Sequence, residues 1–116
     1  MAKPRLELFR GTLDMMVLKA LTLEPAHGYA VARWIEEGTD DLLRIEEGSL
    51  YPALHRMERR RWIVSEWGQS ENNRRAKYYR LTDEGRKKLE AETAAWFKFA
   101  EAVSVVMGSK LQETPQ

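Results

Sequence analysis

The sequence predicts a mainly α-helical protein with a small β-hairpin, in which three short helices precede the hairpin and one long helix follows it. Apolar residues recur at helical spacing in the first half of the chain and again in its last third. In the segment between these two parts, apolar and polar residues alternate with a period of two, which is typical of strands. The 116 residues amount to one ordinary domain, and 43% hydrophobic with 32% charged residues is typical of a globular protein.

The first helix is expected to begin at Thr12, whose side chain can cap the helix N-terminus. Apolar residues then recur at i, i+3, i+4, i+7 and i+8, which places them on one face of an amphipathic helix. They are Leu13, Met16, Val17, Ala20 and Leu21. Pro25 and Gly28 interrupt the pattern, so this helix ends before them.

A second short helix is expected over residues 29–37, with Val31, Trp34 and Ile35 buried. It ends at Gly38, because glycine is favoured at helix C-termini.

The third helix carries polar residues on its exposed face. Pro52 has no backbone N–H and fits a helix best in the first turn, so the helix is expected to begin near Gly48 or Ser49, with Ser49 as its cap. The buried stripe at i, i+4 and i+7 consists of Leu50, Leu54 and Met57. The remaining, exposed face is predicted to carry Tyr51, His55, Arg56, Arg59 and Arg60.

After Trp62 the pattern becomes alternating, which predicts strands over residues 63–67 and 76–81. Residues 68–75 between them are rich in loop-forming residue types, so the two strands form a β-hairpin. The tip and the returning strand carry the basic residues Arg74, Arg75 and Lys77. The aromatic residues expected to pack in the core or across the hairpin are Trp62, Trp67, Tyr78 and Tyr79.

The last helix is predicted over residues 83–107, because Thr82 can cap it and acidic residues follow in the first turn, where the helix dipole favours them. Twenty-five residues at 1.5 Å each give a rod of about 37 Å, which is longer than the protein's own core requires. Its apolar residues form two neighbouring stripes. The first is Leu89, Thr93, Trp96, Ala100, Val103 and Met107, and the second is Ala95, Phe99, Ala102 and Val106.

The two apolar stripes are together wider than one packing face. One stripe can cover the protein's own core, and the other requires a partner chain, because leaving it exposed is costly. We therefore predict a twofold homodimer through the last helix, with the first helix included in the interface. The residues assigned to the dimer interface are Leu89, Thr93, Trp96, Phe99, Ala100, Val103 and Met107.

The charge is segregated along the chain, although the formal net charge is only +1. Residues 34–48 hold six acids and one base, a local charge of −5. Residues 56–88 hold eleven bases and five acids, a local charge of +6. A basic middle third is what a polyanion-binding face requires, and it is also compatible with a solvated surface that carries helical ion pairs.

The sequence contains no constellation typical of an enzyme, so we expect no catalytic activity, metal or cofactor. There are no cysteines, which excludes disulfides, thiolate ligands and cysteine nucleophiles. His27 and His55 alone do not make a typical zinc site, and His27 is interpreted as a structural cap or packing group. No apolar run approaches the length of about 20 residues that a membrane helix needs, and no secretory signal is recognisable, so a cytoplasmic location is expected.

The order of elements is that of a winged helix-turn-helix domain, here residues 1–82, followed by a dimerisation helix, residues 83–108. The final residues, 109–116, are expected to be a disordered tail. The physics suits duplex DNA, because the major groove is about 12 Å wide and admits one α-helix. Basic residues on a projecting hairpin can neutralise phosphates or enter the adjacent minor groove.

The sequence resembles the PadR family of bacterial transcriptional regulators. Residues 47–58 (EGSLYPALHRME) match the recognition-helix motif of that family, and residues 74–85 (RRAKYYRLTDEG) match its wing and the start of its final helix. Residues 11–13 and 27–29 match the openings of its first two helices. The single C-terminal helix resembles the short-form members. Arg61 stands where the family often has glycine, and it is costly there if the backbone needs a positive φ.

The resemblance implies a sequence-specific DNA-binding regulator, a homodimeric repressor that acts on a pseudo-palindromic operator. Ser49 and Tyr51 can donate to phosphate, and Arg56 can pair with the edge of a guanine. The alternatives for Arg56 are an ion pair with Glu58 or exposure to solvent, and the alternative for the hairpin cations is an ordinary charged tip. The residues assigned to DNA are Ser49, Tyr51, Pro52, His55, Arg56, Arg59, Arg74, Arg75 and Lys77.

Trp96 admits two interpretations. It is a packing residue of the dimer interface, or paired Trp96 rings of the two chains sandwich a small aromatic effector, as the resemblance implies. A different function for the whole chain also stays open at this point. The basic face of a winged-helix protein can dock an acidic protein partner instead of DNA.

Overall fold

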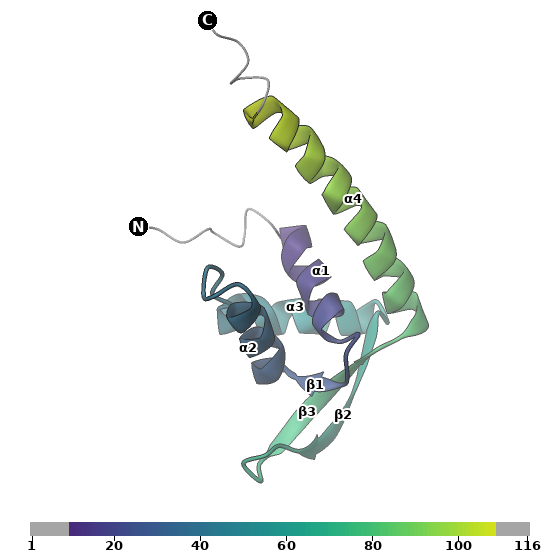
Figure 1. The fold of residues 1–116 in the computed structure, drawn as a ribbon. Helices are drawn as coiled ribbons and strands as arrows, with labels where there is room; N and C mark the ends of the chain where they lie inside the picture. Colours follow the sequence, from purple (N-terminus) through teal and green to yellow (C-terminus); the bar gives the residue numbers. More distant parts are fainter. Residues whose placement is uncertain (1–9, 109–116) are drawn as a thin grey trace, which may run out of the picture.

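The computed structural model describes residues 10–108 and contains four helices and a three-stranded antiparallel sheet (Figure 1). The elements in chain order are α1 (Arg10–Ala20), β1 (Ala26–His27), α2 (Gly28–Gly38), α3 (Glu47–Arg59), β2 (Ile63–Gln69), β3 (Arg75–Leu81) and α4 (Asp83–Met107). The three short helices pack together, the β2–β3 hairpin projects from them as a wing, and α4 runs alongside α1 and then beyond it. The predicted fold class is confirmed. Within the described residues, no helix is long and apolar enough to cross a membrane.

The core lies between α1, α2, α3 and the base of the wing. The stripe predicted on α3 is fully buried, and Ile63 of β2 and Leu89 of α4 close the core from the other side. The largest fully buried side chains are Leu18, Leu50, Leu54, Met57, Ile63, Val17 and Val31. The core therefore fixes α3 by one face and leaves its opposite face open.

Two details of the first two helices differ from the prediction. Thr12 lies inside α1 and does not cap it. Trp34 is 42% exposed, although it was expected to be buried with Val31 and Ile35. The buried face of α2 runs instead through Ala32 and the carboxylate-bearing Glu36, so Trp34 is rotated out of the core.

The short strand β1 was not predicted. Its two residues pair with Tyr79 and Tyr78 of β3, which makes the hairpin part of a three-stranded sheet with the order β1-β3-β2. His27 ends this strand and caps α2, because its Nδ1 accepts a hydrogen bond from the Ala30 amide at 3.1 Å. The ring of His27 also contacts the Tyr78 ring edge-on at 5.3 Å between centroids. The predicted role of His27 as a cap and packing group is confirmed.

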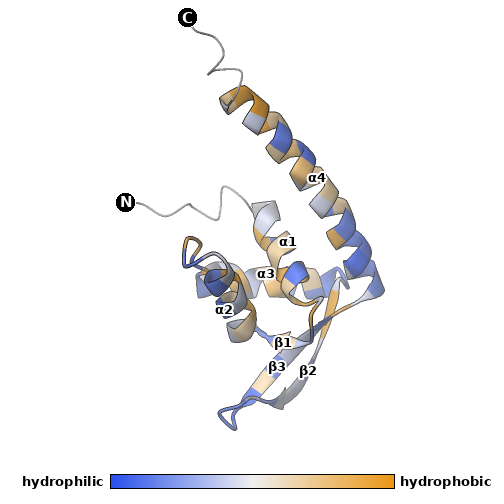
Figure 2. Ribbon diagram, in the orientation of Figure 1, coloured by the Kyte–Doolittle hydropathy of each residue, from blue (hydrophilic) through white to orange (hydrophobic). Residues whose placement is uncertain are grey.

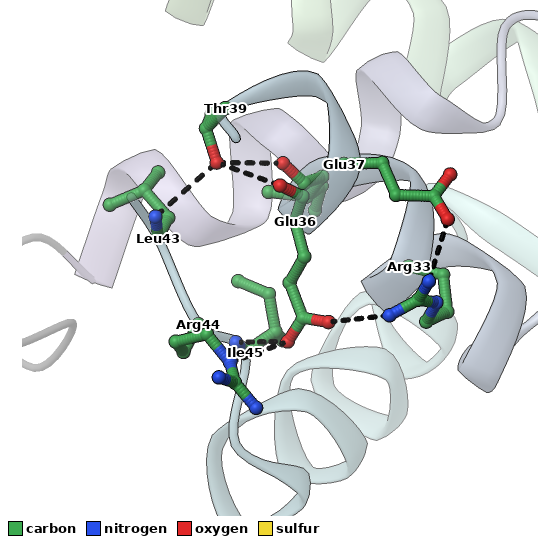
Figure 3. Close-up of polar contacts among 8 residues, drawn as sticks. Arg33, Glu36, Glu37, Thr39, Leu43, Arg44 and Ile45 are labelled. Atoms are coloured by element: carbon green, nitrogen blue, oxygen red, sulfur yellow. Dashed lines mark hydrogen bonds and ion pairs between the residues drawn. The ribbon is translucent and has the colours of Figure 1, made fainter. Parts of the chain in front are cut away.

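A buried glutamate holds the loop between α2 and α3 (Figure 3). Glu36 Oε2 accepts a hydrogen bond from the Ile45 amide at 2.8 Å and lies 3.8 Å from the Arg44 guanidinium, while Oε1 lies 4.0 Å from Arg33. At the top of the same loop, the Thr39 hydroxyl accepts from the Leu43 amide at 3.3 Å. Satisfying a buried carboxylate in this way fixes the point from which α3 begins.

The start of α3 is earlier than predicted. The Glu46 carbonyl accepts from the amides of Ser49 and Leu50, so the helix begins at Glu47 and Ser49 lies in its first turn rather than at the cap. Glu46 itself makes no side-chain capping bond. Pro52 consequently lies in the second turn, inside the helix.

The end of α3 requires a left-handed residue. The Trp62 amide donates to the Met57 carbonyl and the Arg61 amide donates to the Glu58 carbonyl, both at 3.0 Å, which is the hydrogen-bond pattern of a Schellman motif. Arg61 occupies the position of this motif that needs a positive φ, and its φ is 65°. The conformational cost expected of a non-glycine residue at this position is therefore present.

We expect Arg61→Gly to stabilise the protein by about 0.5–1 kcal/mol, because relief of the left-handed conformation exceeds the entropy that glycine loses on folding. Urea unfolding at one fixed protein concentration measures the change. Arg61→Ala is the control, since it removes the same charge but keeps the Cβ atom, and it should not stabilise. Equal stability of the glycine and alanine variants would contradict this explanation.

The helix α4 begins and ends where the sequence predicts. The Thr82 hydroxyl accepts from the Gly85 amide at 2.9 Å and donates toward the carbonyls of Arg61 and Trp62, which joins the start of α4 to the end of α3. Gly85 packs so closely on the Trp62 carbonyl that a Cβ atom would collide with it. The strands of the wing are longer than predicted, by two residues in β2 and one residue in β3.

Candidate nucleic-acid interface

The open face of α3 is centred on three residues that were assigned to DNA. At about 100° per residue, Pro52, His55 and Arg59 lie opposite the buried Leu50 and Met57. All three are exposed. Arg59 has no ion-pair partner among residues 10–108, so its guanidinium is available to an anion.

Arg56 does not share this open face. Its guanidinium points toward α1 and lies 2.7 Å from Asp14 Oδ1, and both side chains are partly buried. The prediction that Arg56 lies beside His55 and Tyr51 on one exposed side is wrong, because neighbouring residues leave a helix about 100° apart. The ion pair joins Arg56 to Asp14 rather than to Glu58. Ser49 precedes Arg56 by seven residues, about two helical turns, and is therefore half-buried on the same side of α3.

Tyr51 lies at the other side of the open face, toward the wing. Its ring packs on Gly28 so closely that a Cβ atom there would lie 2.8 Å from the ring and the hydroxyl, so any larger residue at this position would displace the Tyr51 ring. Burial, followed by the nearby Glu47 carboxylate, raises the pKa of the Tyr51 hydroxyl above its ordinary value. The hydroxyl therefore stays protonated at neutral pH and can donate a hydrogen bond.

The inner face of the wing is set by the strand register. Residues paired directly across the hairpin lie on the same face, and the rows from base to tip are Ile63 with Leu81, Ser65 with Tyr79, Trp67 with Lys77, and Gln69 with Arg75. The first row is in the core and the last two extend away from it. The loop at the tip of the wing is hydrophilic, whereas the base of β2 is apolar (Figure 2).

The three predicted wing cations have different surroundings. Arg74 is exposed at the tip. The Arg75 guanidinium lies 4.6 Å from the centroid of the Trp67 ring, so a cation–π contact orients it. Trp67 is 57% exposed, so of the two packing roles predicted for it, in the core or across the hairpin, the structure shows the second. Lys77 is half-buried, with its ammonium group 3.5 Å from a carboxylate oxygen of Glu58.

A groove of about 580 Å³ separates the wing from α3 and the start of α2. It brings together five of the predicted DNA-binding residues from two elements that are separate in sequence. They are Tyr51, His55, Arg74, Arg75 and Lys77. The groove also includes Tyr29, which is 67% exposed and was not singled out from the sequence. Its position two residues after His27, the N-cap of α2, was the signal available in the sequence.

The outer part of α4 exposes apolar side chains. Leu89 is buried against the core and Trp96 is half-buried, but Val103 is 41% and Met107 is 65% exposed in the single chain. Figure 2 shows apolar residues along the part of α4 that extends beyond α1. Between α1 and α4 lies a second groove, of about 670 Å³, whose walls include Met16 and Trp96. Its lining is more strongly apolar than that of the groove beside the wing.

The sequence model of the transcriptional regulator PadR-like family matches residues 17–91. A protein from Lysinibacillus sphaericus, named only "Uncharacterized protein X", is 27% identical over 103 residues, which cover 89% of this chain and 94% of that protein.

Solved structures of transcriptional regulators have the same fold. A transcriptional regulator from Clostridium thermocellum superposes with a TM-score of 0.80 at 29% identity, covering 88% of this chain and 99% of that one. A PadR family regulator from Eggerthella lenta has a TM-score of 0.73 at 39% identity, and the match covers 95% of this chain and 89% of that one. A PadR family regulator from Clostridium difficile has a TM-score of 0.72 at 31% identity, and the match covers 83% of this chain and 98% of that one. Because the family model matches more than half of the chain and these regulators share its fold, the chain belongs to the PadR-like family of transcriptional regulators, which act by binding DNA.

Proposed function

We propose that the protein is a sequence-specific repressor that binds a pseudo-palindromic operator as a homodimer. The observation that carries this proposal is the juxtaposition of an open α3 face with a wing whose inner face and tip carry cations across one groove. An α-helix fits the major groove, and a projecting basic hairpin beside it then reaches the neighbouring phosphates or minor groove.

Within this proposal the assigned residues have different roles. Pro52, His55 and Arg59 face the base edges or the nearest phosphates, and Tyr51 donates to a phosphate from the side of the wing. Arg74 and Arg75 contact the backbone or the minor groove. Ser49 and Arg56 lie at the edge of α3, and Arg56 reaches a guanine only by exchanging Asp14 for the base. The wing residue Lys77 approaches DNA from the inner face of the wing.

The dimer is supported by the exposed apolar surface of α4. The residues assigned to the interface change from buried to exposed along α4, so its outer half has no cover among residues 10–108. A second copy packed against it would hide this surface and set two recognition helices about one DNA turn apart, near 34 Å. Residues 1–82 would then be the DNA-binding part and residues 83–108 the dimerisation helix. The proposed tail, residues 109–116, lies outside the described residues.

Repression and its relief are part of the same proposal. A dimer bound at an operator blocks transcription in the cytoplasm, where the chromosome lies. The apolar groove between α1 and α4 has the volume and lining for a small flat aromatic compound, which Trp96 would stack against. Binding there would change the angle between α4 and the DNA-binding part and lower the affinity for the operator.

The test begins with duplexes of random sequence that the purified protein retains, which are sequenced to find the operator. Gel-shift titrations on that operator are then made at several salt concentrations. Arg59, Arg74 and Arg75 have no ion pair among the described residues, which gives six such cations in a dimer. We expect the logarithm of the affinity to fall with the logarithm of the salt concentration with a slope of about −5. No selected sequence together with a slope near zero would favour docking of an acidic protein instead.

A further inference from the structure

Glu58 lies close to the C-terminal end of α3 and contacts both strands of the wing. Its Oε2 accepts a hydrogen bond from the Ser65 hydroxyl of β2 at 2.5 Å. Its Oε1 lies 3.5 Å from the Lys77 ammonium group of β3. One carboxylate of the recognition helix thus holds both arms of the hairpin.

The Glu58 contact lies far enough along the wing to affect the orientation of the tip. Below it, Ile63 and Leu81 fix the base of the wing in the core. Ser65 belongs to the next row and Lys77 to the one after it, toward the tip. Among the described residues, no hydrogen bond or ion pair joins α3 to the wing beyond Lys77. The Glu58 carboxylate is therefore the outermost polar link between the two parts of the DNA-binding surface.

A carboxylate at this place weakens the attraction of the surface for a polyanion. Glu58 repels phosphates and partly neutralises Lys77, which would otherwise contribute to DNA binding. The side chains of both residues are about 30% exposed, so their interaction is less screened than that of a surface pair. A role in holding the wing explains why a negative charge lies there.

We propose that Glu58 is a positioning residue that fixes the angle between α3 and the wing, so that the tip cations reach phosphates while α3 lies in the major groove. The inference rests on the proposed function in DNA binding. Lys77 then acts mainly by tying β3 to α3, and direct contact with phosphate falls to Arg74 and Arg75. Specific binding needs this fixed angle, whereas non-specific binding depends on charge alone.

The two roles of the carboxylate predict opposite effects on two kinds of DNA. Glu58→Ala removes a negative charge, so affinity for random duplex DNA should rise about threefold. It also frees the wing, so the ratio of the affinity for the operator to that for random DNA should fall about tenfold. A loss of this size is similar to the effect of one mismatched base pair in a binding site. Glu58→Gln keeps an acceptor for Ser65, and it should lower the ratio by a smaller factor.

Glu66→Ala is the matched control. Glu66 lies on the outer face of the same wing, opposite Tyr78, is exposed and has no ion pair among the described residues. Removing its charge should raise the affinity for both DNAs by a similar factor and leave their ratio unchanged. If Glu58→Ala behaves in the same way as Glu66→Ala, the positioning role is wrong.

A second measurement without DNA separates this inference from the proposed function. Backbone ¹⁵N relaxation of the free protein should show increased motion of residues 66–77 in Glu58→Ala and not in Glu66→Ala. Unchanged wing motion in Glu58→Ala would overturn the inference even if the protein binds DNA as proposed. Absence of DNA binding by the unchanged protein, with increased wing motion in the variant, would instead refute the proposed function alone.

Discussion

Val103→Glu should convert the proposed dimer to a monomer and remove high-affinity binding to the proposed operator. Val103 lies on the outer half of α4, in line with Trp96 and Met107, and is 41% exposed in the part of the chain that the structure describes. In a symmetric interface the substitution places two carboxylates in an apolar contact, and their desolvation costs several kcal/mol each. We expect the dissociation constant of the dimer to rise at least about 1,000-fold.

Sedimentation equilibrium over a range of protein concentrations measures this change. Lys98→Glu is the control, because Lys98 is exposed on about the opposite side of α4 from Val103. This variant should remain a dimer. If Val103→Glu also remains a dimer at micromolar concentration, the interface is not formed by this face of α4.

The second large effect is expected at the tip of the wing. The double variant Arg74→Glu/Arg75→Glu replaces four positive by four negative charges in a dimer. We expect operator affinity at physiological salt to fall at least 100-fold, and the salt slope to weaken from about −5 to about −2, because only the two Arg59 side chains then remain. The stacking of Arg75 on Trp67 is lost as well, which removes the orientation of that side chain.

A control with the same charge change distinguishes contact from general attraction. Arg86 and Lys87 are exposed at the start of α4, at the far end of β3 from the wing tip (Figure 1). Reversing both should weaken binding less than tenfold, through the long-range field alone. Equal losses in the two double variants would mean that the wing tip does not touch DNA.

Elements with local signals were predictable from the sequence. Thr82 and the acidic residues after it mark the start of α4, and the helix begins at Asp83 as expected. The i, i+4, i+7 stripe of α3 is buried as predicted. The family resemblance located the recognition helix and the wing, and it drew attention to Arg61, whose φ is indeed positive.

Features that depend on partners distant in sequence could not be predicted. The two residues of β1 are a strand only because β3 lies beside them. Trp34 is exposed because the fold turns Glu36 inward to hold the loop before α3. Short elements and inward-facing carboxylates leave no periodic pattern, so tertiary structure decides them.

The candidate site shows the same division. That His55 and the wing cations surround one groove follows from the order of the elements. The order of the elements does not predict that Asp14, 42 residues away, holds Arg56, or that Glu58 holds Lys77. An ion pair between two elements depends on how they pack. The helical angle of about 100° between neighbours was nevertheless sufficient to place His55 and Arg56 on different sides of α3.

Hydroxyl-radical footprinting on the selected operator tests the central claim most directly, since it reports the number and spacing of the contacts that a dimer makes. We predict two protected regions on one face of the duplex, related by the symmetry of the site and centred about 10 base pairs apart. A single protected region, bound with one chain per duplex, would contradict the claim that α4 joins two recognition surfaces at the spacing of the double helix.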